Sequence, residues 1–203
     1  CHRGLADLVS LRHTNEVDAA TVNSRIVAHR GSLADTAQLD QGRWTRCGLG
    51  SEIPSPGLKA PPFEYHRPST LDEALDLLAT LDDAKVIAGG QSLLPLMALR
   101  LSRPAHLVDI GDIGVLQSLA QEPDGSLRIG ALVTHRQAET SDLVARCAPL
   151  LAAATPQIGH RAIRTRGTVC GSLAHADPAA ELPAVAVACG ARVTAVSTRG
   201  ARD

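Results

Sequence analysis

A short apolar strand that runs into paired glycines and then into a helix is the feature that most constrains this chain. Val86–Ala88 reads as the strand, and Gly89 and Gly90 can turn sharply and leave no Cβ in the way of a close neighbour. Ser92 is a good residue to cap a helix, and Pro95 falls in its first turn, where a missing N–H costs little. The pattern is typical of a phosphate-binding turn and also of an ordinary turn.

A second turn of the same kind follows some eighty residues later. Arg164–Pro183 contains small and hydroxyl residues around Gly167 and Gly171 and leads into an apolar helix. Two such turns could bind the two phosphates of one dinucleotide.

Four short motifs, in order and at matching spacing, give the chain a specific resemblance to a known family. They are Phe-x-Tyr-His-Arg-Pro at 63–68, Ala-Gly-Gly-x-Ser-Leu-x-Pro at 88–95, the Arg-Gly-Thr turn at 166–172 and Ala-His-Ala-Asp-Pro at 174–178. The chain resembles the FAD-binding (medium) subunit of molybdenum hydroxylases, a group that includes carbon monoxide dehydrogenase and the xanthine dehydrogenase family. The resemblance covers about residues 58 to 203.

The resemblance implies an α+β fold in which FAD lies between two α/β subdomains. The first, residues 58–112, is expected to hold a small parallel sheet, and the second, residues 113–203, a mostly antiparallel sheet that is incomplete here. The implied cofactor contacts are Ala88, Gly89, Gly90, Gln91, Ser92, Thr168, Val169, Cys170, Gly171, Ser172 and Glu181. Glu181 stands where Asp is usual, Cys170 where many members have glycine, and Ser172 where Asn is usual.

The resemblance also implies a function. A large partner subunit would hold the molybdenum cofactor, a small partner subunit the iron–sulfur clusters, and FAD on this chain would pass electrons to an acceptor. No catalytic residue and no metal ligand is expected on the chain, which would not act alone. Two alternatives stay open, a non-catalytic truncated fragment and another flavoenzyme of the same FAD-binding superfamily.

Residues 1–57 have no counterpart in that family. They lack a sustained apolar period and end in a turn-rich stretch from Gly48 to Gly57, so we expect an irregular or disordered leader. The pattern from Leu5 to Leu11 could form one or two helical turns but not a core. Removal of residues 1–57 is therefore predicted to leave folding and flavin binding unchanged.

Local patterns predict the main elements of the remaining chain. Helices are expected over 70–78, 93–101, after a cap at Thr134, and over 141–154 up to Thr155-Pro156; strands are expected over 85–88, 106–110, 127–133 and 191–196. Alternation of strand and helix before residue 113 indicates a parallel sheet.

Composition excludes several classes of function. A net charge of −1 gives no electrostatic case for nucleic acid or an anionic membrane, and the apolar runs are too short to span a bilayer. Five cysteines without a Cys-x-x-Cys pair are typical of free thiols in a reducing compartment, so we expect a cytoplasmic protein without its own iron–sulfur cluster.

Several side chains have two plausible roles. Gln91 and Ser92 could donate to phosphate or only shape the turn, and the basic cluster of Arg161, Arg164 and Arg166 could neutralise a pyrophosphate or form a solvated face. His175 and Asp177 are expected to hold their loop by hydrogen bonds instead of forming a catalytic pair.

Overall fold

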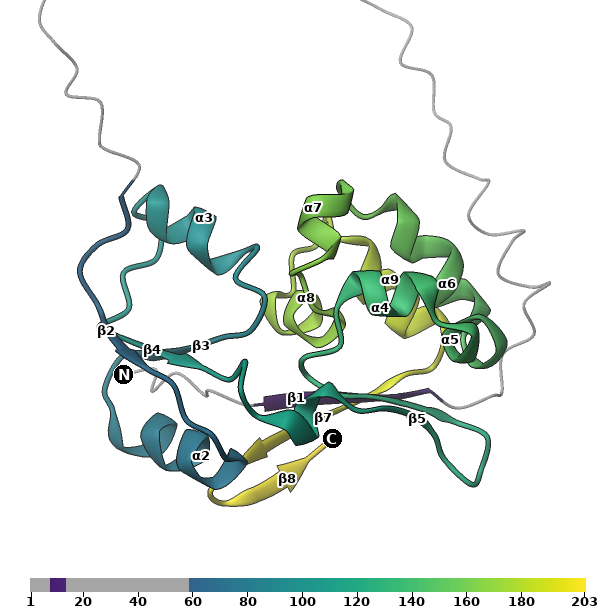
Figure 1. The fold of residues 1–203 in the computed structure, drawn as a ribbon, viewed down its shortest axis with the longest axis horizontal. Coiled ribbons are helices and arrows are strands. Elements are labelled where there is room, and N and C mark those ends of the chain that lie inside the picture. The colour runs from purple at the N-terminus through teal and green to yellow at the C-terminus, as the bar shows by residue number, and fades with distance from the viewer. Residues whose placement is uncertain (1–7, 14–58) are drawn as a thin grey trace, which may run out of the picture.

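The computed structural model describes residues 8–13 and 59–203, which form two sheets with helices packed on them (Figure 1). Residues 61–112 hold the smaller sheet, and the larger one is built from later residues together with 8–13. In the described part of the chain, no helix has both the length and the apolar character needed to cross a membrane.

The smaller sheet is parallel and has three strands in the order β2-β4-β3. Its strands are β2 (Glu64–His66), β3 (Ala84–Ile87) and β4 (His106–Asp109), and the crossovers are α2 (Leu71–Thr80) and α3 (Leu93–Ala98). The predicted helices and strands of this region are confirmed, with α3 ending three residues early. Thr70 begins α2 by accepting a hydrogen bond from the amide of Glu73, which the sequence also predicts.

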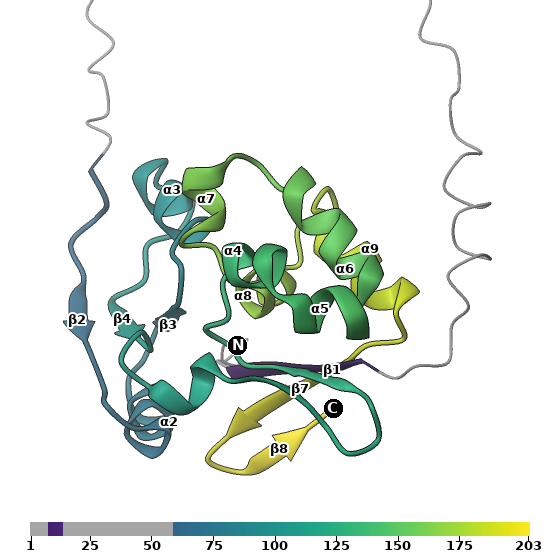
Figure 2. The same ribbon diagram turned by 45° about the vertical axis from the view of Figure 1, so that its right-hand side comes forward.

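This sheet lies between its two helices, α3 on one face and α2 on the other (Figures 1 and 2). On the α2 side, Val108 belongs to one buried cluster with Ala74 and Leu75. Leu107, which points to the opposite face, and Met97 of α3 are also buried. Since both faces are covered, the carboxyl ends of the strands form the open edge, where open α/β sheets bind ligands.

The larger sheet is antiparallel, with five strands in the order β5-β6-β1-β7-β8. The strands are β1 (Leu8–His13), β5 (Leu119–Gln121), β6 (Leu127–Ile129), β7 (Arg192–Ser197) and β8 (Gly200–Arg202). The α+β class, with a small parallel sheet followed by an antiparallel one, is therefore confirmed.

Strand β1 differs from the sequence-based expectation, which was a helical turn in an irregular leader. It pairs with β6 on one side and with β7 on the other, so that Leu11 lies opposite both Ile129 and Val193. Six residues of mixed apolar and polar type fit the period of a helix as well as that of a strand. Pairing with β6 and β7 is what makes this segment a strand. The rest of the predicted leader, residues 1–7 and 14–57, lies outside the described residues.

Six short helices lie on one face of the larger sheet (Figures 1 and 2). They are α4 (His135–Thr140), α5 (Asp142–Cys147), α6 (Pro149–Ala154), α7 (Arg161–Arg164), α8 (Val169–His175) and α9 (Glu181–Ala188), and the 3-10 turns are η1 (Gly114–Gln117) and η2 (Thr155–Gln157). The helix predicted over 141–154 is two helices, because Pro149 has no amide to continue α5 and begins α6 instead. The second of them, α6, ends at Ala154 as predicted, and the 3-10 turn η2 follows it.

Candidate functional site

The first glycine turn leaves the carboxyl end of β3, at the open edge of the parallel sheet. Gly90 has a φ of +72°, and the amide of Leu94 donates to its carbonyl at 3.1 Å. Among the described residues, no acceptor takes a hydrogen bond from the amides of Gly90, Gln91 or Ser92. Three successive amides without an acceptor in the described part of the chain form a donor set suited to an anion.

Ser92 does not cap α3, contrary to the prediction. Its backbone is already helical, at φ −103° and ψ −46°, and its side chain accepts no capping hydrogen bond. A capping side chain needs an extended backbone to reach the first amides of the helix. At α3 the carbonyl of Gly90 accepts from the amide of Leu94 instead. The Gln91 amide lies over its own turn, with Nε2 3.5 Å from the carbonyl oxygen of Gly89.

Gly89 brings the two glycine turns into direct contact. A Cβ at this position would lie 2.0 Å from the carbonyl oxygen of Arg166 and 2.9 Å from Cα of Gly167. No side chain fits in that space, so glycine is required here for close packing of two protein segments. The two turns, far apart in the sequence, therefore lie side by side.

The second turn is held rigidly by its own hydrogen bonds. Thr168 caps α8 by accepting from the amide of Gly171 at 3.1 Å, and the amide of Val169 donates to the carbonyl of Val133 at 3.0 Å. Val169 and Cys170 are buried, and the Cys170 thiol donates toward the carbonyls of Ile129 and Gly130. Val169 and Cys170 therefore hold the turn from its buried side, whereas Gly171 and Ser172 are half-buried.

A buried histidine lies under the second turn, and sequence analysis did not single it out. The amide of His135 donates to the carbonyl of Gly167 at 2.8 Å, and its ring Nε2 lies 3.0 Å from the carbonyl of Thr168. Its Nδ1 is buried without a partner among the described residues, beside the position a Cβ of Gly167 would take. No local pattern marks His135, because its role arises only when α4 meets the turn.

Burial lowers the pKa of His135, the Thr168 carbonyl raises it, and the charge of Arg164 lowers it again. The charge of Glu181 also raises the pKa of this ring. Glu181 is the first residue of α9 and is exposed. Helix α9, which it begins, lies against α8, the helix that follows the second glycine turn.

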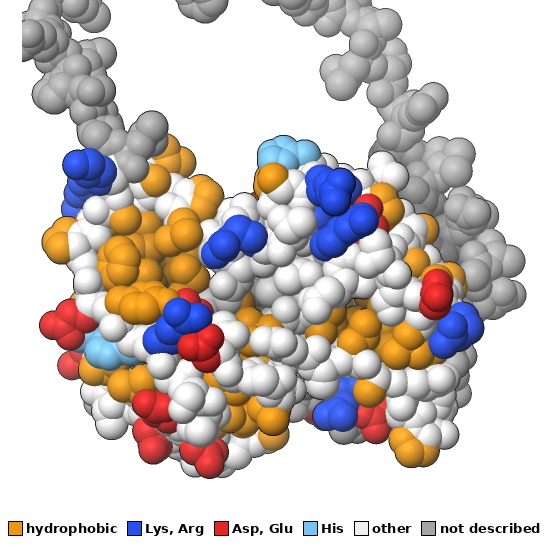
Figure 3. Space-filling view, viewed as in Figure 1, with side chains coloured by type: hydrophobic (Ala, Val, Ile, Leu, Met, Phe, Trp, Pro, Cys, Tyr) orange, Lys and Arg blue, Asp and Glu red, His pale blue; other side chains and the backbone are white. Residues whose placement is uncertain are grey.

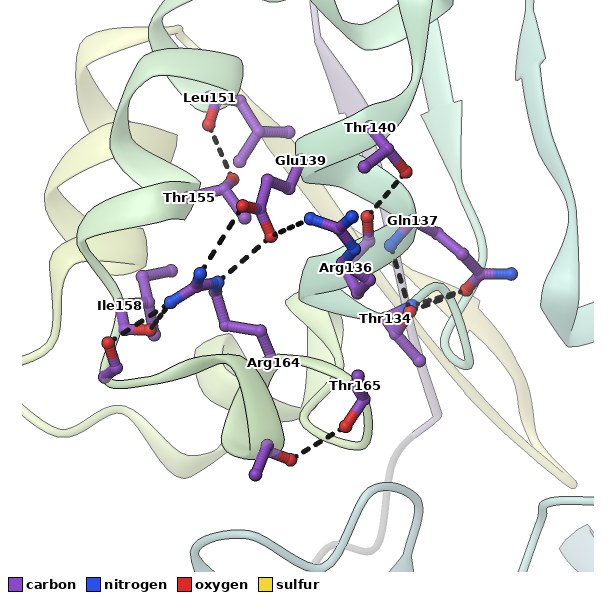
Figure 4. Close-up of polar contacts among 12 residues, drawn as sticks. Thr134, Arg136, Gln137, Glu139, Thr140, Leu151, Thr155, Ile158, Arg164 and Thr165 are labelled. Carbon is purple, nitrogen blue, oxygen red and sulfur yellow. Dashed lines mark hydrogen bonds and ion pairs between the residues drawn. The ribbon is translucent and has the colours of Figure 1, made fainter.

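The basic cluster divides into one structural arginine and two exposed ones. Arg164 pairs with Glu139 at 3.0 Å and donates to the carbonyl of Ile158 at 3.1 Å, while Arg136 approaches the same carboxylate (Figure 4). Its guanidinium holds the pKa of Glu139 below its usual range. Arg164 therefore ties α7 to α4, and only Arg161 and Arg166 keep exposed side chains.

The loop after α8 behaves as predicted at Asp177. Its Oδ1 accepts from the amide of Ala179 at 2.9 Å, and its carbonyl accepts from the amide of Ala180 at 3.0 Å. These bonds form a local turn, and His175 is exposed at the end of α8. A catalytic pair of these two side chains has no support in the geometry.

The surface beside the first turn is apolar. Apolar side chains gather over the region of α3 (Figure 3), and Leu94 of α3 and Leu99 and Leu101 just after it are exposed. Leu94 also covers the turn itself, since a Cβ on Gly90 would lie 3.0 Å from its Cδ1. In the described part of the chain, the amides without an acceptor and the apolar side chain of Leu94 thus lie at the same turn.

Residues 61–203 match the model of a protein family described as the FAD binding domain in molybdopterin dehydrogenase. The chain belongs to this family. The two glycine turns fall inside the matched region, and FAD is the cofactor that such a domain binds. The motif-based resemblance is thereby confirmed.

The relatives agree with this assignment. The chain is 45% identical over 145 residues to the nicotine 6-hydroxylase medium subunit of Paenarthrobacter nicotinovorans, covering 71% of this chain and 51% of that protein. It is 44% identical to the caffeine dehydrogenase subunit beta of a Pseudomonas species, covering 70% of this chain and 48% of that one.

A solved structure gives the same result for the fold. Carbon monoxide dehydrogenase from Hydrogenophaga pseudoflava superimposes with a TM-score of 0.69 at 40% identity, covering 71% of this chain and 50% of that chain. The chain spans about half the length of the relatives it matches.

His135 should make the fold sensitive to mild acid. Because its pKa is lowered in the folded state, the unfolded chain binds a proton first as the pH falls through the ordinary value of about 6.5, and stability is lost from that point downward. We expect His135→Gln to reduce the fall in melting temperature between about pH 7.5 and pH 5.5. The exposed His175→Gln is the matched control and should keep the full wild-type fall; an equal effect of both substitutions would contradict the role of His135.

Proposed function

We propose that this chain is the FAD-binding portion of an electron-transfer subunit in a molybdenum-containing hydroxylase or dehydrogenase. In that complex a small subunit with iron–sulfur clusters would deliver electrons to FAD, and a large subunit would hold the molybdenum cofactor. Support comes from the family match and from relatives that are named a nicotine 6-hydroxylase medium subunit and a caffeine dehydrogenase subunit beta. The three buried cysteines at 147, 170 and 189 suit a reducing compartment, and we place the complex in the cytoplasm.

The observation that carries this proposal is the contact between the two glycine turns at the carboxyl edge of the parallel sheet. The free amides of Gly90, Gln91 and Ser92 point to a pyrophosphate there, with Ala88 and Gly89 completing the turn. The second group of proposed contacts is Thr168, Val169, Cys170, Gly171, Ser172 and Glu181. In this group Gly171, Ser172 and Glu181 are the accessible members, and the buried ones act through the backbone.

FAD supplies the redox chemistry when it is bound, since its ring can accept and release electrons one or two at a time. The chain binds the cofactor and orients it. Arg166 is suited to oppose phosphate charge, because its backbone already lines the contact and its side chain is exposed. We assign no catalytic residue to the described part of the chain and expect no turnover without the partner subunits.

The test uses Gly90, whose positive φ is unfavourable for a β-branched side chain. We expect Gly90→Val to weaken FAD binding by about tenfold or more, equivalent to 1.4 kcal/mol or more, because the strained turn can no longer aim its amides. Quenching of FAD fluorescence by the purified protein measures this. Gly200→Val is the matched control, since Gly200 also has a positive φ, of +117°. A Cβ there meets no atom within 4 Å, and Gly200 begins β8, outside the two glycine turns.

If Gly200→Val lost FAD as completely as Gly90→Val, the first turn would not be the binding element.

The electron-transfer role needs a separate experiment, in which the protein at full natural length is combined with its molybdenum and iron–sulfur subunits. The proposal predicts that FAD becomes reduced when substrate is added to that complex. FAD that stays oxidised when substrate is added to the complete complex would contradict the electron-transfer role.

A further inference from the structure

Two histidines and a glutamate converge on the sheet away from the glycine turns. Glu64 and His66 alternate on β2 and therefore share one face, and His106 lies opposite Glu64 in the parallel register of β4. His66 Nε2 is 3.1 Å from His106 Nδ1, and Glu64 Oε2 is 3.4 Å from the same nitrogen. All three potential ligand atoms lie within 4.8 Å of one another.

These separations fit one metal ion. Zn²⁺ bonds imidazole nitrogen and carboxylate oxygen at about 2.0 to 2.2 Å, so two ligands on a tetrahedron stand about 3.4 Å apart. The separations of 3.4 Å and 3.1 Å lie at that value and slightly below it. The third closes by rotation of the Glu64 side chain, which is 74% exposed and free to move, whereas His106 is 19% exposed and fixed in the sheet.

The ligand chemistry is selective. Imidazole suits zinc, copper, nickel and iron, whereas magnesium and calcium prefer sites made of oxygen alone. Three protein ligands leave a fourth position on the solvent side, where the exposed Glu64 lies. We propose that Glu64, His66 and His106 bind one divalent transition-metal ion, for which Zn²⁺ is the probe.

The proposed ion would join the edge strand β2 to the central strand β4. An edge strand has a neighbour on one side only, so a bridge between side chains adds stability that backbone pairing cannot supply. Glu64 and His106 begin their strands, whereas the first glycine turn follows the end of β3. Metal binding is therefore expected to be independent of FAD binding.

The test titrates ZnCl2 into the metal-stripped chain by calorimetry and repeats the melting curve with and without Zn²⁺. We expect one ion bound per chain at this site and a higher melting temperature in its presence. Loss of a residue that only hydrogen-bonds to a metal ligand already lowers metal affinity by about 10- to 100-fold. Loss of a ligand itself, in His66→Gln or His106→Gln, should therefore weaken Zn²⁺ binding at this site by at least about tenfold. The exposed His175→Gln, outside the cluster, is the matched control and should bind as wild type does.

Unchanged binding and an unchanged rise in melting temperature in both cluster variants would overturn the proposal. Should either histidine variant fail to fold, Glu64→Gln replaces it, because that side chain is mostly exposed. The visible absorption of bound Co²⁺ should then change between wild type and Glu64→Gln, and an identical spectrum would equally overturn the proposal. Titration of FAD with and without a chelator should give the same affinity, which separates this site from the FAD site.

Discussion

Replacement of Gly89 by valine should abolish FAD binding and destabilise the whole described fold. Its Cβ would meet the carbonyl oxygen of Arg166 at 2.0 Å and the carbonyl carbon at 2.7 Å. Both are backbone atoms, so no rotamer change can relieve the clash, and the two glycine turns must move apart. Overpacking of this kind costs about 1 to 3 kcal/mol where side chains can adjust, and we expect a cost at or above the top of that range.

Alanine makes the comparison sharper, because it adds only the Cβ. Gly89→Ala should lower the melting temperature and weaken FAD binding, whereas Gly114→Ala should do neither, since a Cβ on Gly114 meets nothing within 4 Å. Thermal unfolding and quenching of FAD fluorescence measure the two effects. Wild-type values for Gly89→Ala would show that the two turns do not touch in solution.

Removal of residues 1–13 should destabilise the protein strongly, which reverses the expectation drawn from sequence alone. Strand β1 pairs with β6 through Leu11 to His13 and with β7 through Leu8 to Arg12. Without it, β5-β6 and β7-β8 remain as separate pairs, and an isolated two-stranded pair is only marginally stable. The exposed edges of β6 and β7 would also promote aggregation.

The matched control shortens the chain elsewhere. Removal of residues 20–49 keeps β1, and because the sequence predicts an irregular segment there, we expect it to change only the entropic cost of closing a loop, by about 1 kcal/mol or less. We expect this variant to melt near the wild-type temperature and the variant without residues 1–13 to melt well below it or to aggregate. Equal melting temperatures for both would show that β1 is not part of the folded sheet.

The sequence predicted the parts of the fold that depend on local signals. Thr70 and Thr134 cap their helices as expected, since a hydroxyl beside an early helix amide needs no tertiary contact to act. Strand β1 was missed because its partners come from residues more than one hundred positions away. The break at Pro149 could have been recognised, since proline cannot continue a helix from the preceding turn.

The candidate site shows the same division. Motifs indicated both glycine turns, and family membership confirmed the cofactor class, but only the folded chain brings Gly89 against Arg166. The role of Arg164 was open in sequence, and its ion pair with Glu139 settles it as structural. His135 and the cluster of Glu64, His66 and His106 depend on which strands and helices become neighbours, and a linear pattern does not contain that information.

Competition between fragments of FAD can distinguish binding of its pyrophosphate by the two glycine turns from binding of its ring. FAD fluorescence would be followed in the presence of the chain while ADP or riboflavin is added. ADP carries the two phosphates and riboflavin carries none, and the proposed contacts are amides directed at phosphate. We expect ADP to displace FAD and riboflavin at the same concentration to leave it bound. Displacement by riboflavin but not by ADP would contradict binding of the pyrophosphate by the two glycine turns.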